Sequence, residues 1–214
     1  MEAARRLRLR SFATAAHQID LEDAALDRLE RYVALLAVWN KTTRLTGSAD
    51  EGTLVELHVA DSLAVVPLVP AGGTYVDIGS GAGFPGLVIA AVRADVSGRL
   101  IEPRRRRASF LAEAVRTMPL DNAVVDCARA EEISAGLADE GRVDVAVSRA
   151  IRLDQFLPLA SAFLRPGGIA IAMQSIARAA TAEHQGTGLE PTRSIEYPLP
   201  DGSRRRLLLY QRVC

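Results

Sequence analysis

The stretch Tyr75-Val76-Asp77-Ile78-Gly79-Ser80-Gly81-Ala82-Gly83-Phe84-Pro85-Gly86 decides the fold class of this chain. It starts within an apolar run over residues 74–78, which has the length and β-branched content of a buried strand. Four glycines then fall within eight residues, and an apolar helical segment follows. A strand, a glycine turn and a helix form the first unit of a doubly wound α/β sheet, where nucleotide-like cofactors bind against the turn. Gly79 and Gly81 are therefore candidate cofactor-binding residues, because glycine lets the backbone approach a ligand closely.

Glu102 makes this interpretation more specific. It lies sixteen residues after Gly86, at the end of a second strand-like run, Arg99-Leu100-Ile101. An acidic residue at this place can accept hydrogen bonds from both ribose hydroxyls of a cofactor without a 2′-phosphate. NAD and S-adenosylmethionine both meet that description. In the alternative interpretation, Glu102 caps a helix that starts at Arg104.

The composition is that of an ordinary globular protein. Of the 214 residues, 49% are hydrophobic and 24% are charged, which is enough for one domain with a substantial core. No apolar run reaches the roughly 20 residues that span a bilayer, and the basic start lacks the apolar region of a secretory signal. Cys127 and Cys214 lack metal-ligand spacing and are too few for a disulfide framework. We expect a cytoplasmic monomer without a metal site.

Positive charge is carried almost entirely by arginine, because Lys41 is the only lysine. The formal net charge is zero, yet arginines gather at residues 5–10, 104–107 and 204–206. A guanidinium group can bind a phosphate through two parallel hydrogen bonds. Together the clusters favour a polyanionic partner such as RNA. The alternative for each cluster is a solvated surface patch.

The first 70 residues indicate helices. Residues 1–19 show little periodicity and predict a frayed start. A helix is expected from Asp20, which can cap it, with an apolar stripe that ends at Trp39 and marks this side chain for packing. A second helix is expected over residues 50–66. It carries His58, to which we give a structural role in preference to a catalytic one.

From residue 71 the pattern alternates strand and helix, as a parallel sheet requires. Further strands are expected over residues 123–127, 143–148 and 169–173, with helices over 104–118, 154–164 and 176–182 and a turn at 128–132. The chain then reads as two strands, over residues 192–199 and 204–212, joined by Pro200-Asp201-Gly202, which predicts an antiparallel hairpin.

This order is the plan of a class I S-adenosylmethionine-dependent methyltransferase. We therefore expect a Rossmann-like α/β fold with a mostly parallel seven-stranded sheet that ends in an antiparallel hairpin. The methyltransferase domain is expected over residues 71–214, with an N-terminal helical extension over residues 1–70.

Several motifs occur in the order found in one methyltransferase family. They are Trp39-Asn40-Lys41, His58 with Asp61-Ser62-Leu63, the glycine stretch ending in Gly-Phe-Pro-Gly, Arg107 with Phe110-Leu111, Arg129-Ala130-Glu131-Glu132, Ser148-Arg149-Ala150 and Leu164-Arg165-Pro166-Gly167-Gly168. From about Leu21 to Tyr210 the chain resembles the bacterial small-subunit ribosomal RNA methyltransferase G family, also called glucose-inhibited division protein B.

The resemblance implies transfer of a methyl group from S-adenosylmethionine to N7 of a guanine in 16S rRNA of the small ribosomal subunit, near the decoding region. At the matching positions, it implies cofactor contacts by Gly79, Phe84, Ala130, Glu131 and Arg149. Arg149 also lies at the carboxyl end of the fourth predicted strand, beside the first strand, where it could reach a cofactor carboxylate. The alternative for Arg149 is a structural salt bridge.

Three segments depart from the family pattern. The family commonly has a serine-containing turn and a lysine where this chain reads Glu102-Pro103-Arg104-Arg105-Arg106. It usually has Asn at the position of Arg44, and Lys-Gly at the position of Gln174-Ser175. The last change removes a cation from the rim of the active crevice.

The implied reaction needs no general base, because guanine N7 has a lone pair and no proton. We therefore assign no catalytic residue, and alignment of the reacting groups carries the chemistry. An arginine bound to both O6 and N7 of guanine would occupy the reacting lone pair, so any arginine contact should go to phosphate or to O6 alone. We expect Arg44, Arg104, Arg105 and Arg107 to bind RNA phosphates.

Two alternative functions stay open at this stage. The first is a non-catalytic ribosome-binding module with a vestigial cofactor pocket, suggested by Gln174-Ser175. The second is a small NAD-dependent oxidoreductase, which would share the glycine turn and Glu102. The absence of a catalytic Tyr-Lys or His pair and the presence of the terminal hairpin count against the second.

Overall fold

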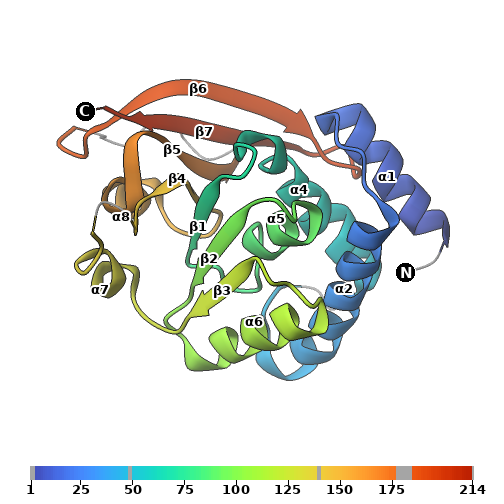
Figure 1. The fold of residues 1–214 in the computed structure, drawn as a ribbon. Helices are drawn as coiled ribbons and strands as arrows, with labels where there is room; N and C mark the ends of the chain where they lie inside the picture. The colour runs from blue at the N-terminus through green and yellow to red at the C-terminus, as the bar shows by residue number, and fades with distance from the viewer. Residues whose placement is uncertain (1–2, 48–49, 139–140, 177–184, 214) are drawn as a thin grey trace.

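The computed structural model describes residues 3–47, 50–138, 141–176 and 185–213 (Figure 1). These residues form one seven-stranded sheet with the strand order β3-β2-β1-β4-β5-β7-β6. The strands are β1 (Thr74–Ile78), β2 (Ser97–Ile101), β3 (Ala123–Asp126), β4 (Val143–Ser148), β5 (Leu164–Ser175), β6 (Leu189–Pro198) and β7 (Arg204–Arg212). Neighbours from β3 to β5 run parallel, whereas β7 is antiparallel to both β5 and β6. The predicted sheet and its terminal hairpin are confirmed.

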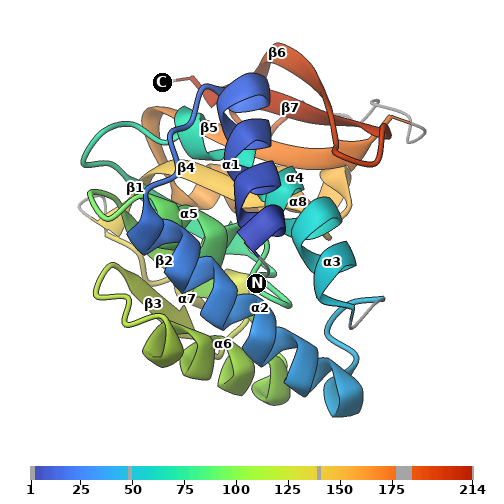
Figure 2. The same ribbon diagram turned by 90° about the vertical axis from the view of Figure 1, so that its right-hand side faces the viewer.

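Two helical layers cover the faces of the sheet (Figures 1 and 2). The helices are α1 (Ala3–His17), α2 (Asp23–Thr43), α3 (Glu51–Thr53), α4 (Ala60–Leu63), α5 (Gly86–Val92), α6 (Arg105–Thr117), α7 (Ala130–Ser134) and α8 (Leu153–Phe163). Residues of α2, α5 and α6 share one apolar cluster with Tyr75, whereas α8 shares the other with Val76 and Ile78. Side chains of a strand alternate between its faces, so β1 contributes to both clusters.

The N-terminal segment differs from its prediction. Residues 1–19 were expected to fray, but α1 is a helix with Leu9 and Ala13 buried. It is held to α2 by ion pairs: Arg6 lies 2.7 Å from Asp27, and Arg10 lies 2.6 Å from Asp23. Ion pairs between two helices do not produce a periodic pattern of apolar residues in either helix. The prediction, which relied on such a pattern, was therefore wrong.

Helix boundaries in the extension also shift. The N-cap of α2 is Glu22 and not Asp20. The second predicted helix does begin after Asp50, whose carboxylate accepts the Thr53 amide at 2.8 Å. It passes through a π-helical turn, Leu54–Val59, before α4, and a 3-10 turn, Val66–Leu68, follows. Trp39 packs edge-on against Phe110 with ring centres 5.6 Å apart, which confirms its packing role.

Three predicted elements after residue 120 differ from the structure or lie outside its described residues. The predicted turn at residues 128–132 is in part the first turn of α7, where the Arg129 amide donates to the Glu132 carboxylate at 3.3 Å. The fifth strand begins at Leu164, before the Pro-Gly-Gly segment, and not at the apolar run that starts at Ile169. The reason is a register shift in the pairing with β4, where Val143 pairs with Leu164 and Val145 pairs with Ile169. The helix predicted over residues 176–182 lies almost entirely outside the described residues.

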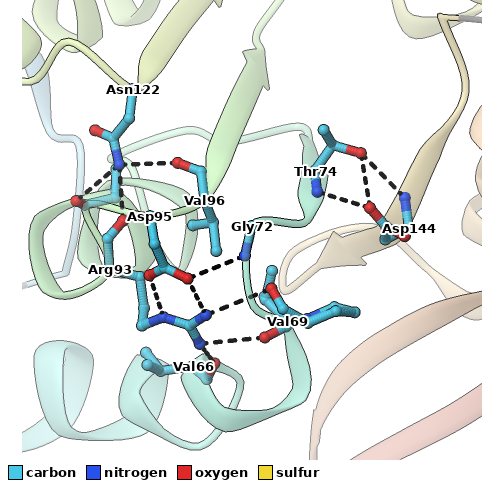
Figure 3. Close-up of polar contacts among 11 residues, drawn as sticks. Val66, Val69, Gly72, Thr74, Arg93, Asp95, Val96, Asn122 and Asp144 are labelled. Carbon is cyan, nitrogen blue, oxygen red and sulfur yellow. Dashed lines mark hydrogen bonds and ion pairs between the residues drawn. The ribbon is translucent and has the colours of Figure 1, made fainter.

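Separate groups of polar contacts hold the amino edge of the sheet (Figure 3). The Arg93 guanidinium lies 2.6 Å from Asp95 and donates to the Val69 carbonyl at 3.1 Å. Nearby, the Asp144 carboxylate accepts both the amide and the hydroxyl of Thr74, at 2.8 and 3.0 Å. These contacts fix the strand starts and leave the opposite edge for ligands.

Candidate cofactor pocket

A pocket of about 680 Å³ opens at the carboxyl edge of the sheet, where doubly wound folds bind their ligands. Its walls come from the ends of β1 and β2 and from the starts of α6, α7 and α8. The residues singled out in the sequence that line it are Gly79, Glu102, Arg104, Arg107, Ala130 and Glu131. Ile151, Gln155, Pro158 and Leu159 add a wall that the sequence did not indicate. The volume lies in the range of small-molecule sites.

The glycine turn is tied to the neighbouring strand by its own backbone. The amides of Gly79 and Ser80 both donate to the Ile101 carbonyl, at 2.9 and 3.0 Å. Gly79 has a φ of +74° and Gly81 a φ of +57°, a region that side chains with a Cβ rarely adopt. A Cβ on Gly79 would also lie 3.0 Å from the Ile151 side chain. Both observations explain why glycine occupies these positions.

Glu102 is buried, with 3% of its surface exposed, at the centre of this arrangement. One carboxylate oxygen accepts the Gly81 amide at 3.0 Å, and the other accepts the Arg104 amide at 2.9 Å. Arg104 is the N-cap of α6, so the capping alternative describes a real contact. Each carboxylate oxygen can accept a second hydrogen bond, and Glu102 lines the pocket. Its contact with a ribose stays a prediction.

Arg149 follows β4 and lies outside the lining of this pocket. Its Nε is 3.1 Å from a carboxylate oxygen of Asp61, and its Nη2 is 2.8 Å from Nδ1 of His58. The guanidinium carbon also lies 5.7 Å from the centre of the Phe84 ring. The salt bridge considered in the sequence analysis is therefore present, while a cofactor contact by Arg149 or Phe84 stays a prediction.

His58 is part of the same cluster. Its ring packs on Phe84 with centres 5.2 Å apart. Burial, and then the charges of Arg149 and Arg205, lower the pKa of His58 from 6.5 to about 4. Because a guanidinium has only donors, Nδ1 of His58 accepts from Arg149. The residue is thus neutral and engaged in structure, as the sequence suggested.

Sequence reasoning missed the residue that completes this cluster. Tyr197 of β6 donates its hydroxyl to Asp61 at 2.6 Å. Asp61 thereby links the N-terminal helices to β4 through Arg149 and to the C-terminal hairpin through Tyr197. The spacing of His58 and Asp61 on one helix was a visible signal, but no local pattern connects them with a tyrosine 136 positions away.

The four candidate RNA-binding arginines divide into two pairs. Arg104 and Arg107 line the pocket, and Nη1 of Arg107 lies 3.8 Å from the point a Cβ on Gly81 would occupy. Arg44 and Arg105 are exposed and lie outside the lining. In the described part of the chain, none of these four side chains forms an ion pair.

Asp77, beneath the glycine turn, offers a test of whether the site suits a cationic cofactor. Its side chain is fully buried, and one oxygen accepts the Gly86 amide at 3.0 Å. The other oxygen has no hydrogen-bond partner among the described residues. Burial raises the pKa of Asp77 to about 7. A positive charge bound nearby would favour the ionised carboxylate, so the buried acid is compatible with the sulfonium and ammonium groups of S-adenosylmethionine.

The described ranges contain neither a candidate metal cluster nor a candidate membrane-spanning helix. No group of three or more His, Cys, Asp or Glu side chains there is arranged to hold a metal ion. No helix there has both the length and the apolar character needed to cross a bilayer.

Comparison with known proteins gives a consistent result. The family model described as GidB, rRNA small subunit methyltransferase G, matches residues 25–197. A ribosomal RNA small subunit methyltransferase G from Neisseria meningitidis is 34% identical over 211 residues, covering 97% of this chain and 99% of that protein. A protein of the same name from Halorhodospira halophila is 37% identical over 158 residues, covering 73% of each chain.

Solved structures show the same fold at low identity. A SAM-dependent methyltransferase from Aquifex aeolicus aligns with a TM-score of 0.58 and 17% identity, covering 75% of this chain and 93% of that one. TYW2 from M. jannaschii, solved in complex with AdoMet, aligns with a TM-score of 0.56 and 13% identity, covering 72% and 74%. The Rossmann-like methyltransferase fold predicted from the sequence is confirmed.

Proposed function

This chain belongs to the rRNA small subunit methyltransferase G family, and from that premise we propose that it methylates N7 of a guanine in 16S rRNA with S-adenosylmethionine as the methyl donor. The observation that carries the proposal is the family match along nearly the whole chain, together with a pocket at the glycine turn. Membership of a methyltransferase family removes the grounds for the oxidoreductase alternative.

We assign the pocket to the cofactor. S-adenosylmethionine supplies an electrophilic methyl group on its sulfonium when bound. Gly79 and Gly81 allow the backbone to lie against the nucleoside, and Glu102 accepts the ribose hydroxyls. Ala130 and Glu131, at the start of α7, contact the adenine. Phe84 and Arg149 serve the methionine end, where Arg149 is held by Asp61 until a cofactor carboxylate offers a second partner.

The residues around the pocket support positioning and not acid–base chemistry. Guanine N7 carries no proton to remove, and His58, with its pKa near 4 and its bond to Arg149, is not placed to act as a base at the reacting atom. Holding nucleophile, methyl group and sulfur in line can by itself supply about 7–11 kcal/mol of the barrier reduction. Ser148, which donates to the Ile78 carbonyl at 2.9 Å, ties the end of β4 to the end of β1 for this purpose.

We assign RNA binding to Arg44, Arg104, Arg105 and Arg107, whose charges are free of carboxylate partners in the described part of the chain. Arg6 and Arg10 of α1 are not assigned this role, since both are paired with carboxylates of α2. The substrate is 16S rRNA or the small subunit assembled around it. We further propose that the protein acts in the cytoplasm as a monomer, with residues 1–70 as the helical extension of the catalytic domain.

The test is methyl transfer from labelled S-adenosylmethionine to small ribosomal subunits that lack the modification, with the product nucleoside identified by mass spectrometry. We expect 7-methylguanosine at one position of 16S rRNA. Cofactor and subunit binding without any labelled nucleoside would instead support a non-catalytic ribosome-binding module. A different methylated nucleoside would keep the enzyme class and overturn the assignment of N7.

A further inference from the structure

A buried amide oxygen without a partner lies near the carboxyl end of β5, outside the lining of the cofactor pocket. Gln174 is the second-to-last residue of β5 and is only 8% exposed. Its Oε1 makes no hydrogen bond to any described residue. Folded proteins rarely leave a buried carbonyl oxygen unpaired, because its lost contacts with water are not replaced. An unpaired acceptor at this place therefore points to a ligand.

An unpaired donor lies next to it. Arg206 of β7 is the direct cross-strand partner of Gln174. Side chains opposed in this way have Cβ atoms about 4.5–5.5 Å apart on one face of the sheet. Nη2 of Arg206 donates to the Ile176 carbonyl at 3.1 Å, but its buried Nε has no partner in the described ranges. One acceptor, Oε1 of Gln174, and one donor, Nε of Arg206, thus lack partners on neighbouring strands.

The pair lies on the same face of the sheet as the pocket. Side chains alternate along β5, and Ala170 and Ala172 belong to the apolar cluster that contains Ile78 and Ile101 of the pocket wall. Gln174, two residues after Ala172, continues that face at the carboxyl edge. Only β4 separates β5 from β1, so the pair is about two strand spacings, roughly 10 Å, from the glycine turn. The pair therefore lies at the same carboxyl edge of the sheet as the glycine turn.

We propose that Gln174 and Arg206 read the Watson–Crick edge of the target guanine, an inference that rests on the proposed function. Guanine presents there one acceptor, O6, followed by two donors, N1–H and the exocyclic amino group. Oε1 of Gln174 accepts from the two donors, and Nε–H of Arg206 donates to O6. This arrangement identifies guanine and leaves N7 free, whereas a guanidinium bound to both O6 and N7 would occupy the reacting lone pair.

The experiment compares Gln174→Leu and Gln174→Glu with wild type on reconstituted small subunits. Each subunit carries either guanine or hypoxanthine at the position that wild type methylates. Hypoxanthine keeps N7, O6 and N1–H and lacks only the amino group. The control is Gln211→Leu, since Gln211 belongs to the same β5–β7 ladder but is exposed and donates to the Gly167 carbonyl at 3.2 Å.

We expect wild type to prefer guanine over hypoxanthine by about tenfold in kcat/KM. Gln174→Leu should lower kcat/KM on guanine by about 30-fold and bring the guanine preference close to one, with the Kd of S-adenosylmethionine changed less than twofold. Its melting temperature should rise, because an unpaired buried carbonyl has been replaced by an apolar group. Gln174→Glu keeps an acceptor and should keep the preference. Gln211→Leu should match wild type.

An additional variant tests the donor. Arg206→Lys keeps the charge and removes Nε–H, and we expect about a tenfold loss of kcat/KM on guanine. If Gln174→Leu keeps the wild-type preference for guanine, the inference is wrong, whether or not its overall rate falls. Wild type would still produce 7-methylguanosine in that case, so the proposed function would stand. If wild type produces none, the proposed function fails and the inference with it.

Discussion

The polar groups at the two edges of the sheet differ in how many partners they have. At the amino edge, Arg93 bonds to Asp95 and Thr74 bonds to Asp144, and these pairs also bond to nearby backbone groups (Figure 3). At the carboxyl edge, Asp77, Gln174 and Arg206 each keep a buried polar atom without a partner among the described residues. Paired polar groups stabilise the fold, whereas a buried polar atom without a partner destabilises it unless a ligand supplies one. The contrast separates scaffold from site.

The arginine clusters repeat this contrast at the surface. In α1, Arg6 and Arg10 pair with carboxylates of α2 and fix one helix on another. At the start of α6, Arg104 and Arg105 make no ion pair with the described residues, although positive charge there opposes the helix dipole. Identical residue types therefore serve folding in one cluster and are available to a polyanion in the other.

The largest effect should come from a substitution in the glycine turn that reduces the affinity for S-adenosylmethionine. Gly79→Ala adds a Cβ that lies 3.0 Å from Ile151 and forces alanine into a φ of +74°. Displacement of the glycine turn should weaken S-adenosylmethionine binding by about 100-fold, equal to about 2.7 kcal/mol. Isothermal titration calorimetry measures the Kd. An unchanged Kd would show that the turn is not part of the cofactor site.

Removing a polar contact at the amino edge should instead lower the stability of the fold and leave cofactor binding unchanged. Asp144→Ala removes the acceptor of the Thr74 amide and hydroxyl, and should lower the free energy of unfolding by about 2–3 kcal/mol. Urea denaturation measures this change. The Kd of S-adenosylmethionine, measured at a temperature where the variant is folded, should stay within twofold of wild type. A large loss of affinity would contradict the division of the two edges.

The cluster around Arg149 should make stability depend on pH. The pKa of His58 is about 4 in the folded protein against 6.5 as its ordinary value, so the unfolded chain binds more protons between these values. The contribution of His58 to the free energy of unfolding is fully present above pH 6.5 and decreases as the pH falls towards 4. After allowance for solvent screening we expect a loss of about 1 kcal/mol. His58→Asn should flatten denaturation midpoints over this window relative to wild type, and an equally steep dependence in the variant would contradict the assignment.

The smallest effect concerns salt. Arg105→Gln should reduce the slope of log Kd for RNA against log salt by about 0.7–0.9, the contribution of one phosphate contact. Arg6→Gln is the matched control: it should lower stability through the lost pairs with Asp27 and Glu30 but leave the slope unchanged. Filter binding of 16S rRNA across a salt series measures both slopes. Equal slopes for Arg105→Gln and wild type would remove this residue from the interface.

Much of the fold could be predicted from local sequence. β1 and β4 agree with their predicted bounds to the residue, because each is a short β-branched run that a glycine or polar residue ends. The hairpin strand β7 agrees equally well, since Gly202 marks its turn with a φ of +83°. These signals lie within a few residues of the structure that they specify.

Where local sequence carried no signal, prediction failed or left alternatives. Helix α1 depends on carboxylates of α2, and the start of β5 depends on its register against β4. Glu102 accepts the Arg104 amide and also lines the pocket, so its capping contact is confirmed while its contact with a ribose stays a prediction. Each of these features joins segments that are separate in sequence.

The sequence by itself determined the fold class, the succession of strands and helices up to the hairpin and the residues of the glycine turn, because these follow from periodicity and contiguous motifs; its motifs also indicated the family by resemblance. Only the tertiary structure decided that Arg149 is held by Asp61, that Tyr197 completes that cluster, and that Gln174 and Arg206 are left open together. Partners 32 to 136 positions apart meet only when the sheet assembles. Burial then determines which of their polar atoms are satisfied.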